Sequence, residues 1–496
     1  MKRIISIQLC LLFAALTSAQ TNKSFVFHHE GTVVCTIPAN QIDSIVIVRK
    51  NAPDPEPDPQ PEPTPDFPKE AIDLGLSVRW ASMNVGAETS GDFGNYYCWG
   101  ETEMRNYWDA NLPSGLPICY SATEHDVATV EWGGLWRTPT VEDMEELVEK
   151  CTWKWWYADN GNMGYKVTGP NGNSIFLPAA GYVETWGGLN DVGIVANYRI
   201  ANDRPGGYCA VLIGDDASHA IDYAKQNAAT WGLSVRPVYG AFNQIVTPRE
   251  EREDLYNIYS EAHGENWNHN TNWPSCYLPY KWEGVVVDNE GHITELHMND
   301  NNMDFRLLVR RLPYLRHLEI SNNPSLGFLD IENTSIDTLI IENSLTGMWV
   351  DKIRYVKLNN FHTTMNGFTG KYVTLEIENA SLTYDPHCRF RDAEIDTLNM
   401  RSVTIETEFK PQVNVLRLHN CSLTRDDNAW GAKVRNRFEC IGTTIVSPIK
   451  YADFEPGCDI IFEDATVCVG NNTRKTLNCA FTNSVENWMK HVMGFE

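Results

Sequence analysis

The segment GENWNHNTNW, residues 264–273, places two tryptophans, four asparagines and a histidine within ten positions. Tryptophan rings can stack on sugars, and imidazole with amide oxygens can ligate a metal ion. The acidic segment 288–304 could also hold a cation loosely, although a solvated edge of a repeat is the favoured interpretation. Which chemistry applies depends on the elements that position these residues.

A second aromatic group lies at residues 153–157 and at Trp186. Flat apolar rings of this kind stack on sugar faces or anchor protein partners. Trp156, Tyr157 and Trp186 lie in turn-rich surroundings, so we predict that they are exposed and bind the ligand. Other tryptophans of this region are expected in the core, namely Trp80, Trp99, Trp136 and Trp153.

Sequence motifs of catalytic sites are absent from the chain. It contains no G-x-S-x-G, no H-E-x-x-H, no G-x-x-x-x-G-K-[ST] and no EF-hand loop. No cysteine lies in a C-x-x-C pair or in a Cys/His cluster, so zinc is not expected. We therefore predict a protein that is not an enzyme, with no catalytic residue, no metal and no cofactor.

The composition is that of a folded chain of several domains. At 496 residues it exceeds a single core, and its 42% hydrophobic content is ordinary for globular protein. Its 40 Lys and Arg against 65 Asp and Glu give a formal charge of −25. This balance argues against nucleic acid and anionic membranes as partners, because nothing would neutralise their phosphates.

The N-terminal residues are typical of an exported protein. Residues 1–19 have a basic start, an apolar run and small residues at a cleavage site, which predicts a signal peptide. The apolar run is too short to span a bilayer, and no transmembrane segment is expected. Residues 20–50 predict a short β-hairpin with a third strand, and residues 51–68 predict a proline-rich, acidic linker. The mature chain would be periplasmic, on the cell surface or secreted.

Residues 69–242 form the next predicted domain, framed by GLSVRW at 75–80 and GLSVRP at 232–237. This echo predicts that the first and last strands lie near each other. One clear helix is predicted within TPTVEDMEELVEKC, with Thr138 or Thr140 as its N-cap. The rest consists of short strand-like segments separated by Gly, Asn and Pro.

The segments AIDLGLSVRWASMNVGA, DFGNYYCWGET, LWRTPTVEDMEELVEKCTWKW, GYKVTGPNGNSIFLPAAGY and GLSVRPV follow one another in this domain. Together they resemble the Fibrobacter succinogenes major paralogous domain, which is common in exported Bacteroidota proteins. The resemblance covers nearly all of residues 70–239. It implies an α+β fold akin to C-type lectins and to formylglycine-generating enzymes, with binding more than catalysis as its role.

The two fold relatives suggest different chemistry for this domain. Calcium-dependent lectins use Glu-Pro-Asn or Gln-Pro-Asp with Trp-Asn-Asp, and none of these triplets occurs in residues 69–242. Formylglycine-generating enzymes need two cysteines on copper, and Cys98 with Cys209 could approach each other. We expect instead a structural disulfide or two buried thiols at these positions.

Residues 292–425 contain a repeat of the form apolar-x-x-apolar-x-apolar. Its starts, from Ile293 to Val413, are separated by 22, 21, 17, 19, 23 and 18 residues, which resembles an irregular leucine-rich repeat. Asn301, Asn323 and Cys421 take the position of an asparagine ladder. Ser344, Phe361, Ala380 and Val403 do not fit that position.

A stack of repeats needs a cap at each end. Residues 243–291 resemble the helical N-terminal cap of plant-type leucine-rich-repeat proteins, in which Trp267, Trp273 and Trp282 would cover the end of the core. His263 and His269 are then ordinary polar residues. Residues 426–496 are expected to form the C-terminal cap with one or two disulfides among Cys440, Cys458, Cys468 and Cys479.

The sequence thus predicts a multidomain chain, an α+β C-type-lectin-like domain followed by an irregular leucine-rich-repeat solenoid. We expect an exported, non-enzymatic binding or adhesion protein with an extracellular protein or glycan as its partner. Two alternatives remain open at this point. One is a carbohydrate-active or modifying enzyme that uses the lectin-like domain, and the other is a structural component of the cell envelope.

Overall fold

The structure is a computed structural model. It describes residues 24–29, 32–38, 70–104, 115–205, 208–332, 336–344, 347–349, 353–360, 362–363, 371–382, 390, 393–425, 429–469, 473–482 and 490. The chain divides into two compact units, residues 1–67 and 68–496. In the first unit, β1 (Ser24–His29) and β2 (Thr32–Pro38) pair antiparallel, which confirms the predicted hairpin. The predicted signal peptide, third strand and linker lie outside the described residues.

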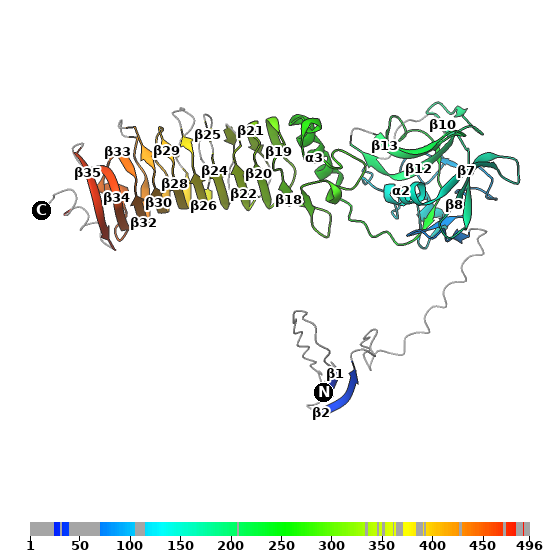
Figure 1. Ribbon diagram of the computed structural model, residues 1–496, viewed down its shortest axis with the longest axis horizontal. Helices are drawn as coiled ribbons and strands as arrows, with labels where there is room; N and C mark the ends of the chain where they lie inside the picture. Colours follow the sequence, from blue (N-terminus) through cyan, green and yellow to red (C-terminus); the bar gives the residue numbers. More distant parts are fainter. Residues whose placement is uncertain are drawn as a thin grey trace. The chain divides into compact units, whose positions relative to one another are not determined.

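The second unit begins with a mainly β region, residues 70–242 (Figure 1). One sheet has the order β3 (Ala71–Ile72), β4 (Arg79–Ala81), β16 (Val238–Tyr239), β6 (Trp136–Arg137). A second has the order β14 (His219–Lys225), β13 (Tyr208–Gly214), β12 (Ala196–Arg204), β15 (Leu233–Ser234), β5 (Tyr96–Tyr97). The remaining sheets are β7 (Thr152–Tyr157), β8 (Met163–Thr168), β9 (Ser174–Pro178) and the pair β10 (Tyr182–Val183), β11 (Leu189–Asn190).

The echoed sequences at the two ends of this region are neighbours in space. Trp80 of β4 lies opposite Val238 of β16 in an antiparallel pair, and both side chains are fully buried. The prediction that the first and last strands meet is therefore confirmed. The region closes on itself, so that its two ends are held by one sheet.

Helix α2 (Val141–Lys150) is the helix that the sequence predicts, and α1 (Val127–Trp132) precedes it. Thr140 is its N-cap, and Asp143 completes a capping box with it. Arg137 binds the same Asp143 carboxylate at 2.6 Å, and both side chains are almost wholly buried. Met144 and Leu147 on the inner face pack into the core against the sheets.

Residues 243–291 connect this region to the strands that follow. They contain α3 (Arg249–Glu261), the 3₁₀ turns η2 (Gly264–Asn266) and η3 (Pro279–Lys281), and β17 (Val285–Val287). Helix α3 begins at Arg249, directly after its N-cap Pro248. We call residues 243–291 the connector.

The connector packs against the first region through a buried ion pair. Arg252 of α3 binds Asp203 of β12, and Arg249 binds the same carboxylate at 2.8 Å. The Arg252 side chain is only 2% exposed. Cys276 of the connector lies in the first region's apolar core, and its carbonyl accepts a hydrogen bond from Asn202.

The three tryptophans of the connector pack against the first repeat, on the side away from the first region. Trp267, Trp273 and Trp282 are buried in the same apolar core as Leu296 of the first repeat. Their rings contact one another at centroid distances of 5.4 and 4.9 Å, and each indole N–H donates to a backbone carbonyl. These tryptophans lie where the predicted cap residues would lie, with no polar atom left without a partner.

The described residues after the connector form a β-solenoid, and the described part of the chain as a whole is mostly β with few helices. The long parallel ladder of the solenoid follows β17 and consists of β18 (Ile293–His297), β20 (His317–Ser321), β22 (Thr338–Glu342), β24 (Tyr355–Asn359), β26 (Lys371–Glu378), β28 (Glu394–Arg401), β30 (Gln412–His419), β32 (Lys433–Ile441) and β34 (Asp459–Val469). Every apolar triplet that the sequence predicts is buried in one core.

Two shorter ladders form the opposite side of the solenoid (Figure 1). One is β19 (Asp304–Val309), β21 (Ser325–Ile331), β23 (Gly347–Trp349), and the other is β25 (His362–Thr363), β27 (Ser381–Leu382), β29 (Thr404–Ile405), β31 (Ser422–Leu423), β33 (Thr444–Ile449). The long ladder runs past residue 425, where the repeats are predicted to end. Antiparallel β35 (Thr473–Phe481) pairs with β34 at the last described position of the stack.

Each repeat turns at one residue with a left-handed backbone. Two residues after the last inward-facing side chain of each repeat, φ is positive, at Asp300, Asn322, Asn343, Asn360, Asn379, Ser402, Asn420, Gly442 and Asp464. Asn, Asp and Gly tolerate this conformation better than other residues. The backbone N–H of Asn343 donates to the carbonyl of Asn359 in the next repeat, and the other corners bond similarly.

Where the residue after a corner is polar, its side chain satisfies buried backbone groups, as Asn323, Ser344 and Thr443 do. Asn323, which is fully buried, donates to the carbonyls of Met298 and Ser321 at 2.7 and 2.9 Å. Its amide oxygen accepts from the backbone N–H groups of Asn301 and Met303 at 3.0 and 3.2 Å. One side chain therefore satisfies four backbone groups that span two repeats.

The expectation that Ser344 falls outside this ladder is wrong. Its hydroxyl accepts from the Asn323 backbone N–H at 2.9 Å and donates to the Glu342 carbonyl at 2.8 Å. Cys421 takes the same position with its thiol, as expected, and Thr443 takes it in the following repeat. A hydroxyl can fill this position because it is both donor and acceptor. Phe361 lies outside the described residues.

We predict that Asn323→Ala destabilises the solenoid by about 3 kcal/mol, because it leaves several buried backbone groups without partners. Asn268→Ala is the matched control, since this exposed side chain makes one hydrogen bond to Asp300. Its effect should stay below about 1 kcal/mol. Urea denaturation followed by circular dichroism measures both, and equal losses would contradict the role of Asn323.

We also predict that Asp203→Ala lowers the free energy of unfolding by about 3 kcal/mol, because the buried Arg252 then loses the Asp203 carboxylate and keeps only that of Glu253. Glu124→Ala removes an exposed carboxylate 3.9 Å from His125 and should change stability by less than about 1 kcal/mol. Thermal denaturation of the two variants and of the wild type measures these losses of stability. An Asp203→Ala protein that melts with the wild type would show that the ion pair does not hold the connector.

Candidate functional site

The aromatic residues of β7 divide between the two faces of the strand. Trp153 and Trp155 point inward, where their rings meet Tyr165 edge to face at 5.3 and 4.9 Å. Trp156 and Tyr157 remain 47% and 64% exposed. Because side chains alternate along a strand, the inward pair sets the outward position of Trp156, and Tyr157 lies at the strand end.

The Trp156 ring has a cation beside it. The ammonium group of Lys154, two residues earlier on the same face, lies 4.2 Å from the ring centroid. Trp156 lies opposite Gly164 of β8, which has no side chain to cover the indole. An exposed ring beside a positive charge suits a ligand with an apolar face and electronegative substituents.

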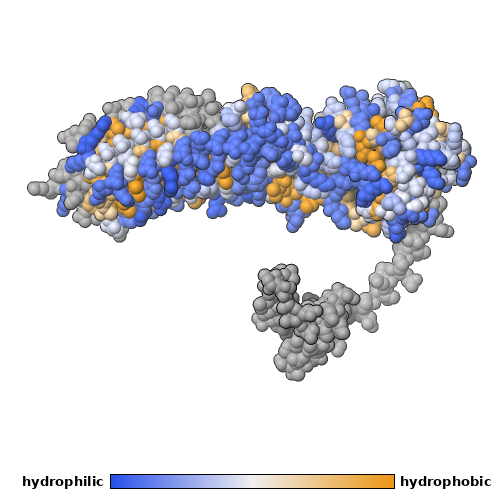
Figure 2. Space-filling model, viewed as in Figure 1, coloured by the Kyte–Doolittle hydropathy of each residue, from blue (hydrophilic) through white to orange (hydrophobic). Residues whose placement is uncertain are grey.

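Trp186 lies in the turn between β10 and β11 and is 60% exposed. Leu189 and Ile194 nearby in the sequence are also more than half exposed. The backbone N–H of Ala179 donates to the Met163 carbonyl of β8, and the N–H of Gly193 donates to the Ala179 carbonyl, so this hairpin region continues from the β7–β8–β9 sheet. We call Trp156, Tyr157 and Trp186 the aromatic group. Figure 2 shows apolar colour on the surface of this first region.

A surface cavity lies beside strands β13 and β14. Its volume is about 470 Å³, and its lining includes the carboxylates Asp215 and Asp222. Asp215 accepts from the backbone N–H groups of Ala217 and Ser218, and these bonds hold its pKa below the usual value. A general acid would need a raised pKa, so Asp215 is suited to a turn and not to proton donation.

The six cysteines predicted as disulfide candidates, Cys98, Cys209, Cys440, Cys458, Cys468 and Cys479, are thiols in the structure. Of the two expectations for Cys98 and Cys209, a disulfide or two buried thiols, the structure has the buried thiols. Burial raises the pKa of Cys209 to about 12. A thiol with such a pKa is protonated and unreactive at neutral pH.

Strand register explains why the C-terminal cysteines are not bridged. Cys440 and Cys479 both lie opposite Phe462, one on each side of β34. They are therefore two strand spacings apart, about 9–10 Å, beyond the reach of a disulfide. Cys468 lies between Pro448 and Arg474, neither of which can form a bridge.

The outward face of the long ladder presents side chains in columns. Parallel strands in register place equivalent residues side by side. The central column is His297, Glu319, Ile340, Lys357, Glu376, Asn399, Arg417 and Glu439. In the view of Figure 2 the middle of the solenoid is mainly hydrophilic.

Polar side chains of this face bind one another from strand to strand. Glu376 accepts from Tyr355 at 2.8 Å and from Asn399 at 3.3 Å. Arg417 donates to the Asn399 amide oxygen at 3.0 Å and lies 3.2 Å from a Glu439 oxygen. A hollow of about 180 Å³ lies over this network. Its residues already satisfy one another, which favours a structural role.

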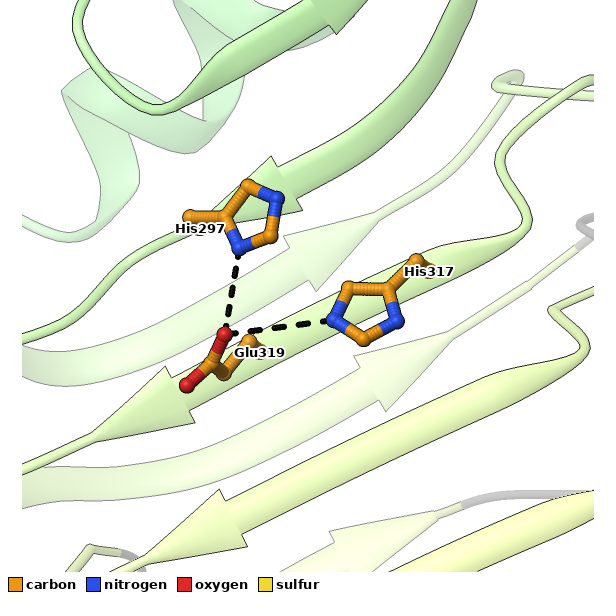
Figure 3. A group of neighbouring side chains, drawn as sticks. All are labelled: His297, His317 and Glu319. Atoms are coloured by element: carbon orange, nitrogen blue, oxygen red, sulfur yellow. Dashed lines mark hydrogen bonds and ion pairs between the residues drawn. The ribbon is translucent and has the colours of Figure 1, made fainter. Parts of the chain in front are cut away.

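The start of the same face has a different composition. His297 of β18 and the pair His317 and Glu319 of β20 bring two imidazoles and a carboxylate together (Figure 3). One ligand atom from each of the three lies within 4.8 Å of the others. Burial lowers the pKa of His297, but hydrogen bonds to Glu319 and Glu295 outweigh burial and raise that pKa above its usual value.

Sequence reasoning missed this cluster. The signal is Glu-x-His at 295–297 and His-x-Glu at 317–319, which occupy the same position of successive repeats. The expectation that no metal binds rested only on the absence of C-x-x-C pairs and of cysteines and histidines clustered in the sequence. A ligand set that spans two repeats becomes visible only when the repeat register is applied to the polar residues.

Within the described residues, no helix combines the length and the apolar character needed to cross a membrane. Comparison of the chain with protein-family models, with curated proteins and with solved structures found no match. The aromatic group and the polar face of the solenoid are therefore interpreted from their own chemistry.

We predict that Cys440, Cys458 and Cys479 all react with N-ethylmaleimide when the protein is unfolded in guanidinium without reductant. Peptide mass spectrometry would then find each of them alkylated. In the native protein Cys209 should stay unmodified, because it is buried and its pKa is about 12. Recovery of a peptide linked through Cys440 and Cys479 would contradict the strand register.

Proposed function

We propose that the chain is an exported, non-enzymatic binding protein of the adhesion type. In this proposal residues 69–242 are a C-type-lectin-like domain of the Fibrobacter succinogenes major paralogous type, and residues 292–425 are leucine-rich repeats. The ligand is an extracellular glycan or protein. The resemblance in the five sequence segments and the buried apolar triplets support these assignments.

The observation that carries the proposal is the exposure of the aromatic group. The same region buries Trp80 completely and Trp99 to within 3% of full burial. It nevertheless leaves Trp156, Tyr157 and Trp186 about half or more exposed. Tryptophan and tyrosine are enriched among the residues that dominate the energetics of interfaces, which supports a binding role for this group.

Sugar stacking is the binding mode that fits Trp156 best. The C–H groups on one face of a pyranose pack on an indole ring, and the sugar's hydroxyl oxygens can accept from Lys154 beside it. A carboxylated sugar would gain further from the ammonium group. We therefore rank acidic glycans first among the ligands.

We predict that a glycan and matrix-protein array identifies a ligand for the mature chain, and that Trp156→Ala and Trp186→Ala each weaken its binding about 30-fold. This is the effect of removing an aromatic hot spot worth about 2 kcal/mol. Lys154→Ala should weaken binding of acidic glycans more than of neutral ones.

Phe305→Ala is the control, because this ring is 66% exposed but lies on β19 of the solenoid. It should bind as the wild type does. Unchanged affinity in both tryptophan variants would remove the aromatic group from the binding site. Turnover of a glycan that is lost with a single carboxylate would favour the enzyme alternative instead.

A further inference from the structure

The cluster at the start of the solenoid face is built by two neighbouring strands. In the register of β18 and β20, Glu295 lies opposite His317, and His297 lies opposite Glu319. All four side chains project from the outward face, because Leu296 and Leu318 between them are fully buried. Two parallel strands thus place two imidazoles and two carboxylates in a square.

The two nitrogens of His297 have different partners. Nδ1 lies 3.1 Å from Oε2 of Glu319, whereas Nε2 lies 3.0 Å from Oε2 of Glu295. A metal-binding histidine commonly uses one ring nitrogen for the metal and donates from the other to a carboxylate, which fixes the tautomer. Glu295 is the carboxylate that can accept this hydrogen bond from Nε2 of His297.

His317 lies at ion-pair distance from the same carboxylate oxygen, without a hydrogen bond to it. Its Nε2 lies 3.9 Å from Oε2 of Glu319, beyond hydrogen-bond length, and its ring centroid is 5.2 Å from that of His297. A ladder of hydrogen bonds explains His297 but not this orientation of His317 (Figure 3). Ligands of a tetrahedral zinc ion are about 3.4 Å apart, so the three donor atoms need only small side-chain rotations.

We propose that His297 Nδ1, His317 Nε2 and Glu319 Oε2 bind a zinc-like divalent ion, with Glu295 as the positioning residue for His297. Two imidazoles and one carboxylate favour zinc over calcium or magnesium, which prefer oxygen ligands. The side chains are 26–35% exposed, so the fourth coordination position faces solvent. That position can accept water or a carboxylate of a partner.

The rest of the face contains a natural control. His419 also lies beside a carboxylate, at 3.6 Å from Glu439, and it projects from the same ladder. Its carboxylate partner is already bound by Arg417 and Arg437, and no second imidazole lies beside it among the described residues. A histidine next to a glutamate on this face is therefore not sufficient for the proposed site.

The test is isothermal titration calorimetry of zinc chloride into the full mature chain after dialysis against a chelator. His297→Ala and His317→Ala should each reduce the stoichiometry by one zinc per chain. Glu295→Gln should keep the stoichiometry and weaken this site about 10- to 100-fold. His419→Ala should match the wild type, and an excess of calcium should not displace the zinc.

Circular dichroism and thermal melting keep the test independent of folding defects. All four variants should retain the wild-type spectrum, and zinc should raise the melting temperature of the wild type and of His419→Ala but not of His297→Ala or His317→Ala. The proposal is overturned if the stoichiometry is unchanged in both histidine variants, if the wild type binds no zinc, or if calcium displaces it.

Discussion

The solenoid depends on one backbone constraint, the left-handed residue at the corner of each repeat. At this residue the chain leaves the long ladder, and the corner N–H bonds to the next repeat. Asn and Asp supply most corners because their short polar side chains tolerate the conformation, and Gly442 supplies one without any side chain. Repeat lengths vary between corners, whereas the residues just before each corner stay in register from strand to strand.

Constant register is what turns single residues into surfaces. On the long ladder, a residue type repeated at one position becomes a column, and different types at adjacent positions become a cluster such as His297 with Glu319. The first region uses a different device, since alternation along β7 turns the half-buried Trp155 toward the core and leaves Trp156 outside. Both surfaces follow from the alternation of side chains along a strand. In the solenoid, the register then aligns the outward side chains of neighbouring strands, whereas in β7 the alternation alone separates the two tryptophans.

Sequence patterns predicted the apolar framework well because burial leaves a periodic trace. The triplets of the repeats, the helix capped by Thr140 and the meeting of β4 with β16 are all present. Polar details were harder, since the function of Ser344 depends on geometry that a hydroxyl and an amide satisfy equally. The expected C-terminal disulfides do not form because pairing depends on strand neighbours, which cysteine counting does not supply.

The connector has a mechanical consequence. Each rung of the solenoid is held only by its two neighbours, so tension along the stack can peel rungs away one at a time, each at a modest force. The connector instead shares side chains with two cores, through Cys276 on one side and Trp282 on the other. To detach it, a pull must break several contacts together, including the Asp203–Arg252 pair. Under load, the repeats most distant from the connector would unfold before the connector detaches. The unfolded repeats would extend while the first region stays attached to the remaining solenoid.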